Sequence, residues 1–163
     1  MKKCVFAGTF DPPTTGHKSV VSDCLKIFDE VVVAVMLNTS KTPLFSVEER
    51  TNLLKKLFKD EKRVNVISFE GAAVDLLDKE NTPFYVRGVR NTIDFEYETA
   101  DYFASKKLKK DLVEIYIPAE QDNLHISSTL VKNSIKFNKD FKEYIPEEIL
   151  PDIEKLLKGK NNV

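Results

Sequence analysis

Residues 8–17, which read GTFDPPTTGH, combine turn-forming residues, hydroxyl groups and one of the two histidines of the chain. The segment follows the apolar run at residues 4–7 and precedes a stretch with helical periodicity. Glycine and proline mark the turn between a strand and a helix, and the free N–H groups at a helix start bind anions. This arrangement suits a phosphate-binding loop, although His17 can also be a surface residue in the first turn of a helix.

Three further groups of polar residues follow other apolar runs. They are residues 38–41 (NTSK), 87–91 (RGVRN) and 123–129 (NLHISST), of which the last opens a helical stretch. Together with residues 8–17 they supply glycines, hydroxyl groups, cations and histidine, with few acids. This composition suits a polyanion such as the phosphate chain of a nucleotide.

Each group has a simpler explanation when it is taken alone. Gly8 can serve a turn, Thr14 and Thr15 can cap a helix, and Lys41 can be solvated. Arg87 is harder to explain in this way, because it ends an apolar strand, where a charge needs a partner. A functional site requires that all four groups meet at one edge of a sheet.

The elements that must position these residues alternate along the chain. Apolar runs predict strands at 4–7, 30–37, 63–69, 83–88 and 113–118. Helical spacing predicts helices at 16–28, 46–58, 72–79, 92–108 and 127–136, and a last helix that begins at Pro146. The run at 30–37 is β-branched without alternation, as in a strand that is buried on both faces. In the helix at 92–108, Ile93, Tyr97, Ala100 and Ala104 share one face.

Strands that alternate with helices predict an α/β fold. We expect a single domain with a Rossmann-like, doubly wound, five-stranded parallel sheet and helices on both faces. Ligands of such sheets bind outside the carboxyl ends of the strands, where the strand order switches. Residues 1–158 form the expected domain, and residues 159–163 form an expected frayed tail.

Composition excludes several classes of partner. The chain has 163 residues and a net charge of −1, so it can bury a core but has no basic field for nucleic acid. No stretch approaches the ~18 apolar residues of a membrane span. Two cysteines, Cys4 and Cys24, make neither a disulfide framework nor a metal site. We therefore expect a cytoplasmic protein that binds neither nucleic acid nor membranes.

Two segments resemble the signatures of a known superfamily. GTFDPPTTGH matches the T-x-G-H form of the nucleotidylyltransferase signature with Thr14, Gly16 and His17, and ISSTLVK (126–132) resembles the second signature. RGVRN and DFEYE (94–98) resemble the phosphopantetheine adenylyltransferase family specifically, and the similarity extends over nearly the whole chain. That family transfers AMP from ATP to 4′-phosphopantetheine, giving dephospho-coenzyme A and pyrophosphate in the penultimate step of coenzyme A synthesis.

The resemblance implies roles for individual residues. His17 would stabilise the transition state at the α-phosphate, and Thr9 would position the attacking phosphate. Lys41 and Arg87 would hold that same phosphate, and Ala73 would touch the pantetheine arm. The residues that match ATP-binding positions are Thr9, Phe10, His17, Gly88, Val89, Arg90, Glu98, Asn123, Leu124, His125, Ile126, Ser127, Ser128 and Thr129.

Finer expectations follow for the nucleotide. Ser128 and Thr129 would bind the β- and γ-phosphates, and Glu98 would contact the ribose or adenine. Asn123 and Leu124 depart from the family pattern, which often has an aromatic residue there. His125 is an alternative second catalytic histidine.

The resemblance also implies a cofactor and an assembly. Mg²⁺ would accompany ATP and be held by phosphates and water without protein ligands, because Asp11 can act as a loop cap. The family forms homo-hexamers. Two alternatives remain: another nucleotidylyltransferase of this fold, specific for nicotinamide mononucleotide or transferring a cytidylyl group, and a nucleotide sensor without turnover.

Overall fold

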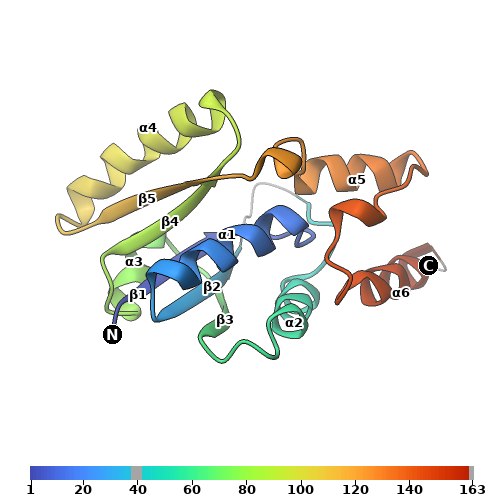
Figure 1. Cartoon of the computed structure of the whole chain (residues 1–163), viewed down its shortest axis with the longest axis horizontal. Coiled ribbons are helices and arrows are strands. Elements are labelled where there is room, and N and C mark those ends of the chain that lie inside the picture. Colours follow the sequence, from blue (N-terminus) through green and yellow to red (C-terminus); the bar gives the residue numbers. More distant parts are fainter. Residues whose placement is uncertain (38–41, 162–163) are drawn as a thin grey trace.

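The computed structural model describes residues 1–37 and 42–161. Five strands and six α-helices alternate along most of the chain (Figure 1). The strands are β1 (Lys3–Gly8), β2 (Glu30–Met36), β3 (Val64–Phe69), β4 (Phe84–Val89) and β5 (Val113–Pro118). The helices are α1 (Thr15–Ile27), α2 (Val47–Leu57), α3 (Ala73–Lys79), α4 (Thr92–Leu108), α5 (Ser128–Lys136) and α6 (Leu150–Asn161), with short 3₁₀ turns at Gln121–Asn123 and Lys142–Tyr144.

All five strands pair in parallel in the order β3-β2-β1-β4-β5. The chain starts at the centre, builds one half through β2 and β3, and then returns to add β4 and β5 on the other side of β1. The strand order therefore switches between β1 and β4. This is the doubly wound, Rossmann-like sheet that the sequence predicts.

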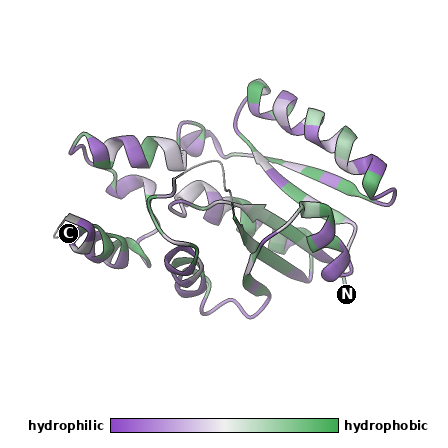
Figure 2. Cartoon of the chain, turned by 180° about the vertical axis from the view of Figure 1, so that it is seen from behind, coloured by the Kyte–Doolittle hydropathy of each residue, from purple (hydrophilic) through white to green (hydrophobic). Residues whose placement is uncertain are grey.

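Two hydrophobic cores lie on opposite faces of the sheet. The larger joins β1 and β2 to α1, α2, α5 and α6, and includes Phe6, Val33, Leu54 and Ile153. The smaller lies under α3 and includes Val5, Val32, Leu76 and Leu77. Successive valines of β2 thus enter different cores, which confirms that this strand is buried on both faces. Figure 2 shows the central strands as the most hydrophobic part of the molecule.

The last helix begins later than the sequence predicts. It begins at Leu150 instead of Pro146, because Pro151 has no N–H with which to continue the hydrogen bonds of the turn at residues 146–149. It also continues to Asn161, into the expected frayed tail. Lys160 pairs with Glu49 of α2 at 3.2 Å, and lysines suit the C-terminal end of a helix dipole.

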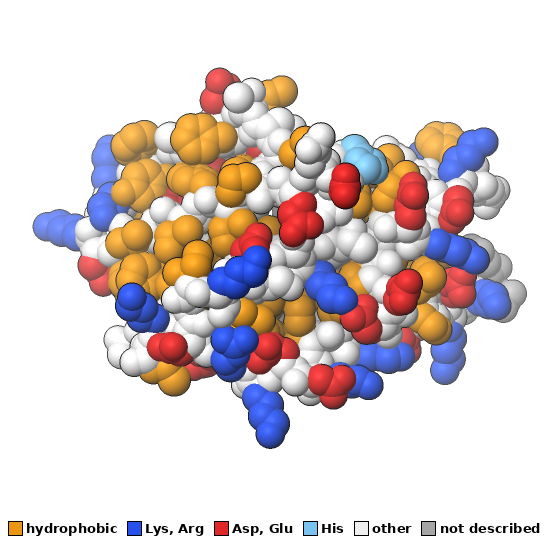
Figure 3. Space-filling model, in the orientation of Figure 1, with side chains coloured by type: hydrophobic (Ala, Val, Ile, Leu, Met, Phe, Trp, Pro, Cys, Tyr) orange, Lys and Arg blue, Asp and Glu red, His pale blue; other side chains and the backbone are white. Residues whose placement is uncertain are grey.

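Helix α4 presents its apolar residues to the outside. Ile93 and Tyr97 are 74% and 76% exposed, Ala100 and Ala104 are exposed too, and α4 buries no residue completely. The sheet beneath α4 carries Arg87, and the helix meets it with Glu98 and Asp101, while Tyr102 packs against the smaller core. Figure 3 shows hydrophobic side chains gathered over α4 and β5.

None of the helices within residues 1–37 and 42–161 combines the length and the apolar character that crossing a membrane requires.

Candidate active site

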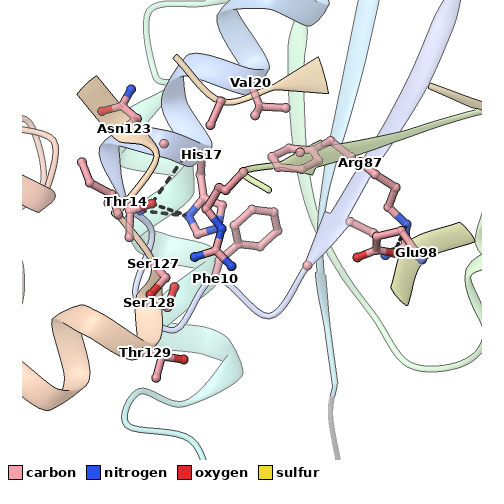
Figure 4. Close-up of a pocket in the computed structure, with 18 residues that line it drawn as sticks. Phe10, Thr14, His17, Val20, Arg87, Glu98, Asn123, Ser127, Ser128 and Thr129 are labelled. Carbon is pink, nitrogen blue, oxygen red and sulfur yellow. Dashed lines mark hydrogen bonds and ion pairs between the residues drawn. The ribbon is translucent and has the colours of Figure 1, made fainter. Parts of the chain in front are cut away.

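A cavity of about 280 Å³ lies at the carboxyl ends of β1 and β4, where the strand order switches (Figure 4). Its lining comes from the loop after β1 and the start of α1, from the end of β4, from α4, and from the segment between β5 and α5. The predicted site residues that line it are Phe10, His17, Arg87, Gly88, Arg90, Glu98, Asn123, Ile126, Ser127, Ser128 and Thr129. Three of the four polar groups that the sequence singles out therefore meet here, while residues 38–41 lie outside the described part of the chain.

His17 is held by the residue that begins its own helix. The Thr14 side chain accepts a hydrogen bond from the His17 N–H, and the Thr14 backbone N–H donates to His17 Nδ1 at 3.0 Å. A backbone N–H can only donate, so Nδ1 is the acceptor and the proton of the neutral ring resides on Nε2. Nε2–H is then the donor that remains for a ligand.

The charge state of His17 follows from its surroundings. Burial and, to a smaller extent, the positive charge of Arg90 together lower the pKa of His17 to about 4. The ring also packs edge-on against Phe10, with 4.8 Å between centroids. At neutral pH His17 is therefore an uncharged hydrogen-bond donor with a fixed orientation.

Two helix N-termini open onto this cavity. Thr14 caps α1, and Ser127 caps α5 by accepting from the Leu130 N–H at 3.0 Å. Ser128 then donates to the carbonyl of Pro12 at 2.8 Å, which joins the two loops. Free N–H groups at two helix starts, together with the partial positive charge of each helix dipole, suit a chain of phosphates.

The close approach of β4 to α1 requires a glycine. A Cβ atom at Gly88 would lie 3.0 Å from Cγ2 of Val20 on α1. Both residues line the cavity. The absence of a side chain at position 88 therefore sets the width of the cavity between strand and helix.

Asp11 anchors the loop after β1. Its buried carboxylate accepts hydrogen bonds from the backbone N–H groups of Leu44 and Phe45, both at 2.9 Å, and Lys132 Nζ lies 3.4 Å away. The buried Arg50 of α2 donates to the Thr9 carbonyl at 2.6 Å. Asp11 thus acts as the loop cap that the sequence allowed.

Arg87 lies among three carboxylates. Its Nε is 3.1 Å from Glu114 and 3.0 Å from Glu98, and its NH2 is 2.8 Å from Asp101. Burial alone would lower the pKa of Arg87, but Tyr85 and the carboxylates raise it, so the guanidinium stays charged. Burial raises the pKa of Glu98, and Arg87 opposes that shift. Arg87 therefore has the partners that a charge at a strand end needs.

Several expected site residues lie outside the cavity lining. The Thr9 side chain, Leu124 and His125 are exposed, and His125 contacts only the ring edge of Tyr144 among the described aromatic residues. Ala73 packs into the smaller core, and Val89 is partly buried beside the lining. Lys41 lies outside the described residues.

Sequence reasoning did not name Ala7, Val20 and Ala119 as site residues, yet all three line the cavity. Val20 follows His17 by three positions and therefore shares its helix face, a signal that periodicity could have supplied. Ala7 and Ala119 have no such signal, because small apolar residues at strand ends are common.

The described residues include no group of three or more His, Cys, Asp or Glu side chains arranged to hold a metal ion.

The chain matches a family model and many curated proteins. The cytidylyltransferase-like family model matches residues 5–134. A phosphopantetheine adenylyltransferase from Campylobacter fetus is 40% identical over 159 residues, which covers 98% of each chain. One from Flavobacterium psychrophilum is 37% identical over 91% of this chain and 98% of its own.

A solved structure shares the fold. It is described as a putative nicotinate-nucleotide adenylyltransferase from Vibrio parahaemolyticus, with a TM-score of 0.66 and 25% identity over 96% of this chain and 99% of that chain. Three observations indicate the same family. They are the T-x-G-H histidine at a helix start, the second signature across the cavity from it, and the similarity over the full length of the chain. The chain belongs to the cytidylyltransferase-like family and, within it, to the phosphopantetheine adenylyltransferases.

Proposed function

We propose that the protein transfers the adenylyl group of ATP to the phosphate of 4′-phosphopantetheine, giving dephospho-coenzyme A and pyrophosphate. The similarity to phosphopantetheine adenylyltransferases over nearly the full length supports this reaction. The structural observation that carries it is the neutral His17, which presents Nε2–H in a cavity between two helix N-termini.

The reaction needs no general base. A phosphomonoester carries ~1.5 to 2 negative charges at pH 7 and is already a nucleophile. The site must hold two anions in line and stabilise the charge that builds on the α-phosphate. A neutral imidazole with Nε2–H donates to a nonbridging oxygen without first losing or gaining a proton. One such donor contributes about 10²- to 10³-fold in rate.

The two ends of the cavity divide the substrates. Ser128, Thr129 and the α5 N-terminus would hold the β- and γ-phosphates, which leave as pyrophosphate. Arg87 on the other side would bind the acceptor phosphate, assisted by Lys41 and Thr9. Ala73 would contact the pantetheine arm.

We propose that Mg²⁺ enters with ATP. Asp11, the carboxylate of the first signature, is committed to two backbone N–H groups and Lys132. Phosphate oxygens and water would therefore supply the ligands, as Mg²⁺ commonly accepts. When bound, the ion would neutralise charge on the leaving pyrophosphate.

We also propose that the protein is a homo-oligomer, and a hexamer by family resemblance. The exposed apolar side chains of α4 support this, because a cluster of this kind usually marks a contact surface. The free thiols of the buried Cys4 and Cys24 support a cytoplasmic setting.

An acceptor assay tests the proposed reaction. The protein is incubated with ATP, Mg²⁺ and either 4′-phosphopantetheine, nicotinate mononucleotide, nicotinamide mononucleotide or phosphocholine (with CTP replacing ATP), and pyrophosphate is measured. Release with 4′-phosphopantetheine alone supports the proposal, and the His17→Ala variant is the control for contaminating activity. Release with a mononucleotide would favour the reaction named for the Vibrio structure. ATP binding without any release would indicate a sensor.

A further inference from the structure

Four side chains from β4 and β5 share the sheet face that α4 covers. Tyr85 pairs with Glu114, and Arg87 pairs with Tyr116, in the parallel register of the two strands. Directly paired residues of a sheet point to the same face, and so do residues two positions apart. Arg87 therefore meets two side chains of β5 that the signature motifs do not include.

Glu114 uses both of its carboxylate oxygens. Oε1 accepts from Arg87 Nε at 3.1 Å, and Oε2 accepts from the Tyr116 hydroxyl at 2.7 Å. The Glu114 side chain is only 2% exposed. The Tyr116 ring rests edge-on against Phe95 of α4, with 5.0 Å between centroids. Tyr116, which is itself packed against Phe95, thus holds the carboxylate oxygen of Glu114 that does not bind Arg87.

The guanidinium of Arg87 is fixed on its face and on one edge. Its central carbon lies 4.4 Å from the centroid of the Tyr85 ring, and its Nε faces Glu114. NH2 pairs with Asp101, whose side chain is 54% exposed, and within the described residues NH1 donates no hydrogen bond. An exposed ion pair is weak and exchanges readily, so the two terminal nitrogens are the part of Arg87 that a ligand can take.

We propose that Glu114 is a positioning residue for the acceptor phosphate: it holds the Nε edge of Arg87 and so fixes the plane in which the terminal nitrogens are offered to that phosphate. This rests on the proposed function, in which Arg87 binds the phosphate of 4′-phosphopantetheine. Two parallel N–H donors from one guanidinium match two phosphate oxygens, but only if the plane of the guanidinium is fixed.

The positions of Glu98 and Asp101 explain why Glu114 is needed to orient Arg87. Glu98 and Asp101 both belong to α4 and draw the guanidinium toward that helix. Glu114 belongs to the sheet and opposes this pull from beneath. Without it, Glu98 of α4 alone would hold the Nε edge, and the plane of the guanidinium would no longer be fixed from the side of the sheet.

Kinetics and direct binding of the Glu114→Gln and Tyr116→Phe variants test the proposal. The KM for 4′-phosphopantetheine and its Kd by calorimetry should both rise about 10-fold or more for Glu114→Gln, as for small displacements of a binding group. The KM for ATP should stay within about 2-fold. Tyr116→Phe should shift the same constants in the same direction by a smaller factor. Glu96→Gln, the same chemical change on the exposed surface of α4, is the matched control.

A double-mutant cycle separates positioning from a general structural effect. In an Arg87→Ala background, Glu114→Gln should add no further loss of acceptor affinity, because its effect passes through Arg87. Equal rises in both KM values, or an undiminished effect in that background, would overturn the proposal. So would wild-type affinity in Glu114→Gln. If the wild-type protein neither binds nor adenylylates 4′-phosphopantetheine, the proposed function itself is wrong. The wild-type measurements alone show this, independently of the Glu114 variants.

Discussion

The backbone nitrogen of Thr14 lies 3.0 Å from Nδ1 of His17, so the residue that caps α1 also fixes the tautomer of the histidine three positions later. One residue thereby gives the helix its start and gives the ring its orientation. The proton available to a phosphate is on Nε2 as a consequence of backbone geometry, and among substitutions at position 14 only proline removes the donating N–H.

His17→Ala should lower kcat by about 10²- to 10³-fold, because it removes a donor to the charge that builds in the transition state. ATP affinity should change far less, since most ground-state phosphate contacts come from helix N-termini. Steady-state kinetics with an independent measurement of ATP binding check this. His17→Gln, which keeps an N–H donor, should lose less; equal losses of kcat and ATP affinity in His17→Ala would show a binding role only.

The stability of the protein should depend on the protonation of His17. The pKa of His17 is about 4 in the folded chain, while an unfolded histidine titrates near 6.5, so below pH 6.5 the unfolded state binds the extra proton. Stability contributed by His17 is complete above pH 6.5 and is lost as pH falls toward 4, by about 3 kcal/mol in total. Urea unfolding between pH 4 and 7 measures it, and the slope should be smaller in His17→Gln. An unchanged slope would contradict the low pKa.

Gly88→Ala should destabilise the protein by about 1–3 kcal/mol, because the new Cβ would lie 3.0 Å from Val20 Cγ2 and would force β4 and α1 apart. Thermal unfolding measures the loss. Val20→Ala removes the opposing methyl group, so Gly88→Ala should cost less in that background than alone. If the losses of stability in Gly88→Ala and Val20→Ala simply add in the double variant, the contact between positions 88 and 20 does not set the distance between β4 and α1.

Ile93→Glu and Tyr97→Glu should each weaken self-association, since they place a charge within the exposed apolar surface of α4. The mass of the wild-type protein measured by sedimentation should exceed the 18.6 kDa of a monomer, and the masses of the variants should be closer to that value. Lys55→Gln on the exposed side of α2 changes the net charge by the same −1 and controls for charge alone. A monomeric wild-type protein would leave the α4 surface to another partner.

The sequence predicted the local features of the fold and the site, but not those that depend on how distant elements pack. A buried run such as that of β2 depends on neighbouring residues only, and this strand was predicted correctly. The outward face of α4 was not predicted, because helical spacing shows that apolar residues share a face but not which way the face points. The turn before Pro151 was missed because Pro146 also resembles a helix start.

The site shows the same division. The signatures placed His17 and Ser128 correctly at helix starts around the cavity. The partners of Arg87 could not be foreseen, because Glu114 reaches it only through the register of β4 and β5, a non-local property. The tautomer of His17 likewise needs the position of a backbone nitrogen.

The hydrogen bond from Ser128 to the carbonyl of Pro12 closes a sequence separation of 116 residues. The first signature is made early on the ribosome, yet it gains this partner only after most of the chain has emerged. Under the proposed function, a nascent chain that ends before position 128 would carry His17 but lack the second helix N-terminus of the nucleotide site, so nucleotide binding would begin only once α5 has been made and has folded against the first loop.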